Sequence, residues 1–241
     1  MRPIGGSFNL TGKGWPMSVG SFEGITLLKH VPDPLRTELA QRLRVKQAHK
    51  GQSLVERRSS PTEVFFLLEG QAEVTLYSSD GNEVCVHDIG PGDLFGEIAV
   101  LDGEPRSASV VASSEVKVAV MRAGDFMACI GSSPAAATWL ARQLASGMRR
   151  LTEQVFELSV LNVRARVHCE LLRLAGKGER HEGGIEVYPA PTHLKLSKKI
   201  ASCREAVTRE LNELSNQHII SYEGRKLIIF DLTRLEQAAQ R

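Results

Sequence analysis

The spacing of apolar residues changes once along the chain, at Pro134, and this change limits the fold more than any other feature. From Val45 to Val120 the apolar runs are short or alternating, and they are separated by Gly51, Gly70, Gly81, Gly90, Gly92 and Gly103. That pattern predicts many short antiparallel strands in a roll, barrel or sandwich. Beyond Pro134 the spacing becomes helical. The sequence therefore predicts a β-rich part followed by a helical part.

The clearest local element of the β-rich part is a hairpin. Two alternating segments, Ala72–Tyr77 and Glu83–Ile89, are separated by a turn that contains Asp80 and Gly81. An Asp-Gly pair tolerates the positive φ angles of tight hairpin turns. We therefore expect these segments to pair as antiparallel strands.

The first helical segment has the spacing of a coiled coil. Its seam residues are spaced alternately four and three residues apart: Ala137, Ala141, Leu144, Met148, Leu151, Val155, Leu158 and Asn162. This period fits a two-stranded coiled coil, in which a terminal polar Asn162 could set the register. We predict a dimer interface at Leu144, Met148, Leu151, Val155 and Leu158. The alternative is a helix that packs within its own chain.

The remaining residues predict a winged helix-turn-helix. A helix at 164–175 is followed by a polar loop through Pro191, a helix at 194–200, a break, and a helix at 204–216. Two short apolar runs, 219–222 and 226–230, then flank Glu223 and Gly224. Helix, turn, helix and wing follow one another in the expected order. The inward side chains should be Leu196, Ile200, Val207, Leu211 and Leu214.

A chain of 241 residues is long enough for two domains. We expect a flexible arm at 1–20, a β-roll at 21–133, a dimerisation helix at 134–163 and a DNA-binding domain at 164–241. Residues from 164 onward carry 14 Lys and Arg against 10 Asp and Glu, whereas the rest carries 16 against 18. This asymmetry weakly favours a polyanionic partner for the C-terminal part.

The cysteine pattern and the apolar runs bear on localisation. Four scattered cysteines without a C-x-x-C spacing and the lack of a leader segment predict a reduced, cytoplasmic protein. No apolar run approaches the roughly 20 residues of a membrane-spanning helix. We expect no membrane association.

The segment 95–108, FGEIAVLDGEPRSA, carries the groups of a ribose-phosphate site. Gly96 allows close backbone approach, and a short helix that begins near Glu97 would direct free amides at an anion. Arg106 can bind a phosphate in a forked geometry, Ser107 can add a hydroxyl, and Glu97 can accept a hydrogen bond from a ribose hydroxyl. The alternative is that Glu97 and Arg106 form an internal ion pair in a surface turn.

The second helix of the helix-turn-helix carries residues that can read DNA. Arg204, Glu205, Thr208 and Arg209 lie in its first two turns, where a recognition helix contacts base edges. Arginine matches the two acceptors of guanine, and glutamate can accept from cytosine N4. The alternative is a solvated charged helix. Thr192, Lys195, Lys198, Lys199, Cys203 and Lys226 are candidate phosphate contacts, which position a protein without specifying sequence.

Segment 95–108 resembles the phosphate-binding cassette of cyclic-nucleotide-binding domains, because it has the F-G-E-(apolar)-A core and the P-R-S-A ending. The resemblance implies that Glu97 binds the ribose 2′-hydroxyl and Arg106 the cyclic phosphate. Ser107 would assist, and Gly96, Ile98 and Ala99 would complete the contact surface.

From about Phe22 to Leu232 the chain resembles the CRP/FNR superfamily of bacterial regulators. Its R-E-x-V-x-R recognition helix is matched by Arg204, Glu205, Val207 and Arg209. The resemblance implies a homodimer that binds a palindromic operator with TGTGA-like half-sites, and RNA polymerase as a further partner. It also implies cyclic AMP as the first-choice ligand and cyclic GMP as the second.

The sequence departs from that family at the residues that touch the base. Two neighbouring hydroxyl residues of the dimer helix do so in the family, and here the matching pair is Leu151 and Thr152. One hydroxyl is missing, which leaves the identity of the base open because a polar reader contributes to discrimination.

Other function classes have less support. We find no P-loop, no H-E-x-x-H and no recognisable nucleophile motif, so an enzyme is not expected. The scattered cysteines argue against an iron–sulfur cluster. Cys85 and His87 could ligate haem from one strand face, although Glu97 and Arg106 would then have no role. We expect no prosthetic group. Regulators that need no ligand or that bind a cyclic dinucleotide stay open.

Overall fold

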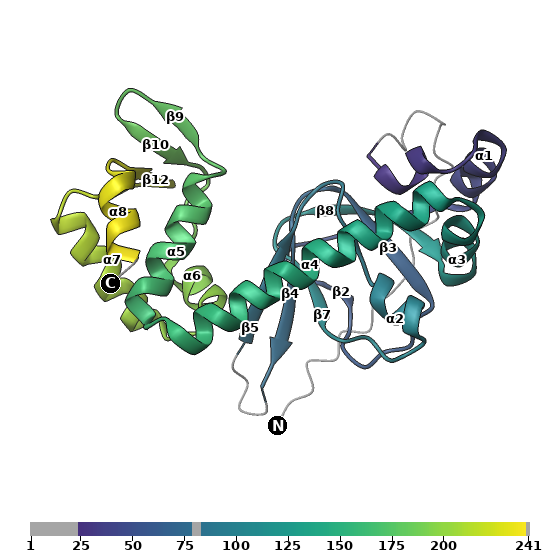
Figure 1. The fold of residues 1–241 in the computed structure, drawn as a ribbon, viewed down its shortest axis with the longest axis horizontal. Helices are drawn as coiled ribbons and strands as arrows, with labels where there is room; N and C mark the ends of the chain where they lie inside the picture. The colour runs from purple at the N-terminus through teal and green to yellow at the C-terminus, as the bar shows by residue number, and fades with distance from the viewer. Residues whose placement is uncertain (1–23, 79–82, 240–241) are drawn as a thin grey trace. The chain divides into compact units, whose positions relative to one another are not determined.

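The computed structural model describes residues 24–78 and 83–239, which form two compact units divided after Gly147 (Figure 1). The predicted arm at 1–20 and the Asp80-Gly81 turn lie outside the described residues. The described part contains no helix that is long and apolar enough to cross a membrane.

The first unit combines short helices with eight strands. Its elements are η2 (Thr26–His30), α1 (Asp33–Arg42), β1 (Arg44–Ala48), β2 (Ser53–Val55), β3 (Glu63–Glu69), β4 (Ala72–Tyr77), β5 (Glu83–Ile89), β6 (Leu94–Phe95), α2 (Glu97–Asp102), β7 (Ser109–Ala112), β8 (Val116–Arg122), α3 (Ala123–Ser132) and the first part of α4 (Pro134–Val160). The strands form two antiparallel sheets, ordered β1-β8-β3-β6 and β2-β7-β4-β5.

The central strands β3 and β8 are buried on both faces, which explains why they read as continuous apolar runs. Phe65 and Leu67 enter one core cluster with Ile89 and Val110 of the second sheet. The alternate residues, such as Phe66, enter another core cluster with side chains of η2, α1, α3 and α4. One face of the first sheet thus meets a second sheet, and the other is covered by helices. This arrangement is an antiparallel β-roll.

The second unit contains the last part of α4, the helices α5 (Val163–Ala175), α6 (His193–Lys199), α7 (Arg204–Asn216) and α8 (Leu232–Ala239), and the strands β9 (Glu179–His181), β10 (Gly184–Val187), β11 (Ile220–Glu223) and β12 (Lys226–Ile229). The strands form one antiparallel sheet, ordered β11-β12-β10-β9. The predicted inward residues are all buried in its core: Leu196, Ile200, Val207, Leu211 and Leu214. Helices α6 and α7 with the β11–β12 hairpin form a winged helix-turn-helix.

Several sequence-based predictions agree with the structure. The hairpin strands at 72–77 and 83–89 pair as expected, with a bulge between Val74 and Thr75. The helices after Pro134 occur at the predicted places. Helices α1, α3 and α8 were not predicted, since their short apolar patterns do not stand out from the surrounding sequence.

The prediction for Asn162 was wrong. It is not a seam residue of the long helix, because α4 ends at Val160 and the Asn162 side chain caps α5 by accepting from the Ala165 amide at 2.9 Å. Asparagine is a favoured N-cap residue, and this local contact ends the heptad pattern.

The polar loop predicted before Pro191 was also wrong in part, because it contains the β9–β10 hairpin. Ile185 and Val187 are buried, whereas the intervening Glu186 is not. This short alternation was the available signal in the sequence. In the structure β10 pairs with both β12 and β9.

Candidate functional site: a partly buried cassette and an exposed recognition helix

The predicted cassette begins with a backbone turn at Gly96. Gly96 is left-handed, with φ 83° and ψ 4°, and immediately precedes α2. A Cβ atom at Gly96 would lie 2.6 Å from Nη1 of Arg106. The space that a Cβ atom would occupy at Gly96 is therefore filled by the side chain of Arg106, from the same cassette. A second left-handed glycine, Gly103, ends α2.

Arg106 is buried, with 5% of its surface exposed. Its guanidinium donates hydrogen bonds to the backbone carbonyls of Gly96 and of Glu63 at the start of β3. The Arg106 backbone also pairs with the loop before β3, through Arg58 and Ser59. Burial lowers the pKa of Arg106, whereas the nearby carboxylates of Glu63 and Glu97 raise it. Arg106 thus links the end of the cassette to its beginning.

Glu97 lies at the first position of α2. Burial raises the pKa of its carboxyl group above the ordinary value, although its own backbone amide and the charge of Arg106 oppose the shift. No ion pair joins Glu97 to Arg106 in the described structure, so the alternative of a simple surface ion pair has no geometric support. A carboxylate that is costly to bury and has no paired cation is typical of functional sites.

The other predicted ligand-binding residues occupy varied positions. Ala99 is buried under α2, whereas Ile98 and Ser107 are exposed beside Glu97 and Arg106. Thr152 lies on α4, where its hydroxyl donates to the Met148 carbonyl at 3.0 Å. Its role as a base reader stays a prediction. The Glu63 carbonyl was missed, because a backbone contact leaves no signal in the residue types.

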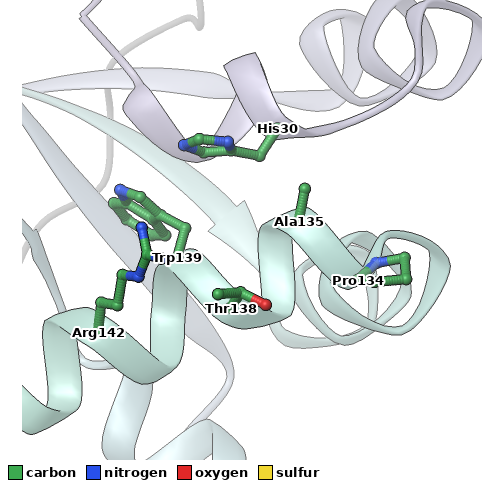
Figure 2. A pocket seen from close by; sticks show the side chains of 6 residues that line it. All are labelled: His30, Pro134, Ala135, Thr138, Trp139 and Arg142. Atoms are coloured by element: carbon green, nitrogen blue, oxygen red, sulfur yellow. The ribbon is translucent and has the colours of Figure 1, made fainter.

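Two hollows in the first unit lie apart from these residues. One, of about 340 Å³, lies between η2 and the start of α4, where His30 and Trp139 face each other with ring centroids 6.2 Å apart (Figure 2). The other, of about 370 Å³, is apolar and extends along α3 and α4 to Leu144. None of the predicted ligand-binding residues lines either hollow.

The recognition helix α7 begins at Arg204 with Cys203 as its N-cap residue. Arg204, Glu205 and Arg209 are exposed, as readers of DNA must be. Thr208 is half-buried, and its hydroxyl lies 2.9 Å from Nδ1 of His193 on α6, so it also has a contact inside the domain.

The predicted phosphate contacts lie around α6 and the wing. Thr192 caps α6 by accepting from the Lys195 amide at 3.1 Å. Lys226 on β12 forms an ion pair with Glu186 at 3.0 Å. Lys195, Lys198 and Lys199 belong to α6, and Lys199 forms an ion pair with the buried Glu170 at 3.1 Å. Their contacts with DNA stay predictions.

The predicted dimer interface is an exposed apolar stripe on α4. Leu144, Met148, Leu151, Val155 and Leu158 are all exposed, with Met148 at 72% and Val155 at 63%. Large apolar side chains in a row on one helix usually mark an interaction surface.

Cys85 and His87 lie on β5, and Cys85 is almost fully buried whereas His87 is half-buried. Over the described residues there is no group of three or more His, Cys, Asp or Glu side chains arranged to hold a metal ion.

Comparison with known protein families assigns both halves of the chain to a class. Residues 45–133 match the cyclic nucleotide-binding domain, and residues 165–238 match the Crp-like helix-turn-helix domain. The two matches together span more than half of the chain. These domains define a transcription regulator that binds DNA and carries a cyclic-nucleotide domain, and such regulators are not enzymes.

Individual relatives agree with this class. The chain is 28% identical over 178 residues to the CRP-like cAMP-activated global transcriptional regulator of Mycobacterium tuberculosis, covering 73% of this chain and 80% of the relative. It is 29% identical over 170 residues to the cAMP-activated global transcriptional regulator CRP of Pasteurella multocida, covering 69% and 80%.

A solved structure supports the same class. A CRP-family transcriptional regulator from Thermus thermophilus is similar with a TM-score of 0.67 and 27% identity, covering 81% of this chain and 97% of that one. The chain belongs to the CRP/FNR superfamily of transcriptional regulators.

Proposed function

We propose that this regulator binds a cyclic mononucleotide in the β-roll, and that the ligand controls the affinity of a homodimer for a palindromic operator. Cyclic AMP is the first-choice ligand and cyclic GMP the second. The observation that carries the proposal is the state of Glu97 and Arg106. Arg106 is buried and Glu97 is half-buried at the start of α2, and no ion pair joins the two residues. Desolvation raises the pKa of the Glu97 carboxyl group.

The chemistry of these two groups fits a ribose cyclic phosphate. Two N–H groups of Arg106 donate to carbonyls, and the guanidinium carries five in all, so it keeps donors for an anion. An ionised Glu97 accepts hydrogen bonds from a ribose hydroxyl. Gly96, Ile98, Ala99 and Ser107 complete the proposed ligand surface.

The DNA-binding part of the proposal rests on α7. Arg204, Glu205 and Arg209 would contact base edges, with Thr208 beside them, and Thr192, Cys203 and Lys226 would contact the backbone. A two-fold dimer places its half-sites about 34 Å apart along the duplex. RNA polymerase is a further proposed partner.

Dimerisation through α4 is supported by the exposed apolar stripe from Leu144 to Leu158. The apolar hollow between α3 and α4 continues this surface, because Leu144 belongs to both. A second copy of α4 would cover apolar area that a monomer leaves in water.

Calorimetric titration of the full chain with cyclic AMP and with cyclic GMP tests the ligand. We expect binding of one nucleotide at micromolar affinity or tighter. Glu97→Gln should weaken it by about 1.5–3 kcal/mol, the range for hydrogen bonds to charged groups. The matched control is Glu104→Gln, an exposed residue of the same segment. Binding of neither nucleotide would favour a ligand-independent regulator or another effector, and an absorbance scan would reveal haem.

The coupling between ligand and DNA is tested by fluorescence anisotropy with and without nucleotide. A ligand shifts a conformational equilibrium only by its differential affinity for the two states. A coupling of about 1–3 kcal/mol gives roughly 5- to 150-fold tighter DNA binding. Equal DNA affinity in both conditions would contradict ligand control.

A further inference from the structure

The recognition helix α7 has a buried polar contact with α5. His168 on α5 is 0% exposed, and its Nε2 lies 2.6 Å from Oε1 of Glu210 on α7. Nε of Arg164 donates to the same oxygen at 3.1 Å. The Glu210 carboxylate is mostly buried, and it joins α7 to α5 through two donors.

The His168 ring makes its hydrogen bond through one nitrogen. Nε2 contacts Glu210, whereas Nδ1 is buried without a hydrogen-bond partner in the described structure. The directional contact of this ring is therefore made to α7.

A second histidine contacts α7 from α6. Nδ1 of His193 lies 2.9 Å from the Thr208 hydroxyl, and its ring meets Tyr222 of the wing edge-on at 5.5 Å. Burial lowers the pKa of His193, and the charge of Arg204 lowers it further. The neutral form of His193 is therefore favoured. The His193 ring thus contacts both α7 and the wing.

The two contacts lie on opposite flanks of α7. Thr208 and Glu210 are two positions apart, which places them roughly 160° apart around the helix. Between them lies the buried face of Val207, Leu211 and Leu214. Apolar packing is non-directional, so it holds this face inward without fixing a small rotation about the helix axis. Directional hydrogen bonds on both flanks restrict that rotation.

Stability alone does not account for the His168–Glu210 pair. Burying a charged carboxylate carries a desolvation cost, and apolar replacements of similar volume are often equally stable. Apolar replacements would not fix the orientation of α7, because apolar contacts are non-directional.

We propose that His168 and His193 are positioning residues for DNA reading. They fix the rotation of α7 about its axis and thereby direct Arg204 and Arg209 at the base edges. This inference rests on the proposed DNA-reading role of α7.

The test compares two variants of His168, and the variant His193→Leu, in the full chain. His168→Leu removes the donor, and His168→Gln keeps an N–H group near the place of Nε2. The control is His181→Leu, which removes an exposed histidine near Glu179 of β9. The probes are a duplex selected from a random-sequence library by the unchanged protein, with cyclic AMP and cyclic GMP present, and a scrambled duplex of the same composition.

We expect His168→Leu to lose about tenfold in affinity for the selected duplex and less than about twofold for the scrambled one, since one lost base contact costs about that much. His168→Gln should restore most of the selectivity, and His181→Leu should change neither affinity.

Parallel losses on both duplexes, accompanied by a lower melting temperature, would show that His168 only stabilises the fold and would overturn the inference. Unchanged selectivity in both His168→Leu and His193→Leu would overturn it as well. If the unchanged protein selects no sequence from the library, the proposed DNA-reading function fails together with the inference. Failure of the inference alone leaves that selection intact.

Discussion

The arginines of the two halves stand in opposite environments. Arg106 in the cassette is buried and donates to two backbone carbonyls, whereas Arg204 and Arg209 on α7 are exposed. A group withdrawn from water must have its hydrogen bonds satisfied within the fold, so Arg106 belongs to the fold as well as to the proposed site. Arg204 and Arg209 do not carry that constraint. If the proposed sites are correct, the same residues serve folding and ligand binding in the cassette, whereas different residues serve folding and DNA binding on α7.

The largest expected effect comes from Arg106→Ala. Loss of the guanidinium should weaken cyclic-nucleotide binding by about 2–5 kcal/mol, the range for truncating a buried charged partner. It should also destabilise the fold by about 1–3 kcal/mol, since two backbone carbonyls lose a donor. Calorimetric titration and chemical denaturation measure the two effects, with the exposed Arg44→Ala as control. If Arg106→Ala lost affinity for the nucleotide but kept the stability of the parent, Arg106 would not serve both the fold and the proposed site.

Arg204→Ala, unlike Arg106→Ala, should weaken binding without destabilising the fold. We expect it to weaken binding to the selected operator by about 1–3 kcal/mol. Its stability should stay within about 0.5 kcal/mol of the parent, as is usual for exposed positions. Anisotropy titrations and melting curves measure these quantities, with Arg180→Ala on β9 as a charge-matched control. Equal losses on operator and random DNA would make Arg204 a phosphate contact instead.

Gly96→Ala tests whether the close contact between Gly96 and Arg106 serves nucleotide binding as well as folding. The new Cβ would lie 2.6 Å from Nη1 of Arg106, at a backbone φ of 83°. We expect a loss of stability of about 1–2 kcal/mol from the left-handed backbone, and weaker nucleotide binding because the guanidinium must shift. Gly103→Ala is the matched control, since Gly103 has φ 75° and open space around the Cβ position. Equal nucleotide affinity in Gly96→Ala and Gly103→Ala would exclude a role in nucleotide binding for the close contact between Gly96 and Arg106.

The smallest effect should appear in the pH dependence of stability at Glu97. Its folded-state pKa is raised by burial above the ordinary value of 4.5. The contribution of the group to stability is therefore complete below pH 4.5 and is lost as the pH rises through the raised value. Glu97→Gln should remove this decline and be at least as stable as the parent at neutral pH. Melting temperatures measured from below pH 4.5 to neutral pH show this decline, and an unchanged pH profile would contradict the raised pKa of Glu97.

Local patterns in the sequence were sufficient to predict much of the fold. The alternation at 72–77 and 83–89, the glycine before Glu97 and the inward residues of α6 and α7 are all short-range signals. The family resemblance then supplied the β-roll and the functional interpretation of residues 95–108. Asn162 was misread because a heptad position and an N-cap position are both suited to asparagine.

What the sequence could not predict are contacts between distant segments. The Glu63 carbonyl accepts from Arg106, 43 positions away, and any residue type could supply that carbonyl. His168 and Glu210 are 42 positions apart, and neither residue type predicts a buried pair. Such contacts depend on how the elements pack, which periodicity does not encode.

The burial of β3 on both faces has a consequence for hydrogen exchange. β3 lies between β8 and β6 in its sheet and contributes to two core clusters. The amides of such a strand exchange only when most of the unit unfolds, whereas those of peripheral loops exchange through local opening. Because Arg106 is hydrogen-bonded to the first residue of β3, the proposed ligand cassette is attached to the strand that we expect to exchange most slowly in its unit. A bound nucleotide that strengthened this anchor would slow the exchange of the whole roll.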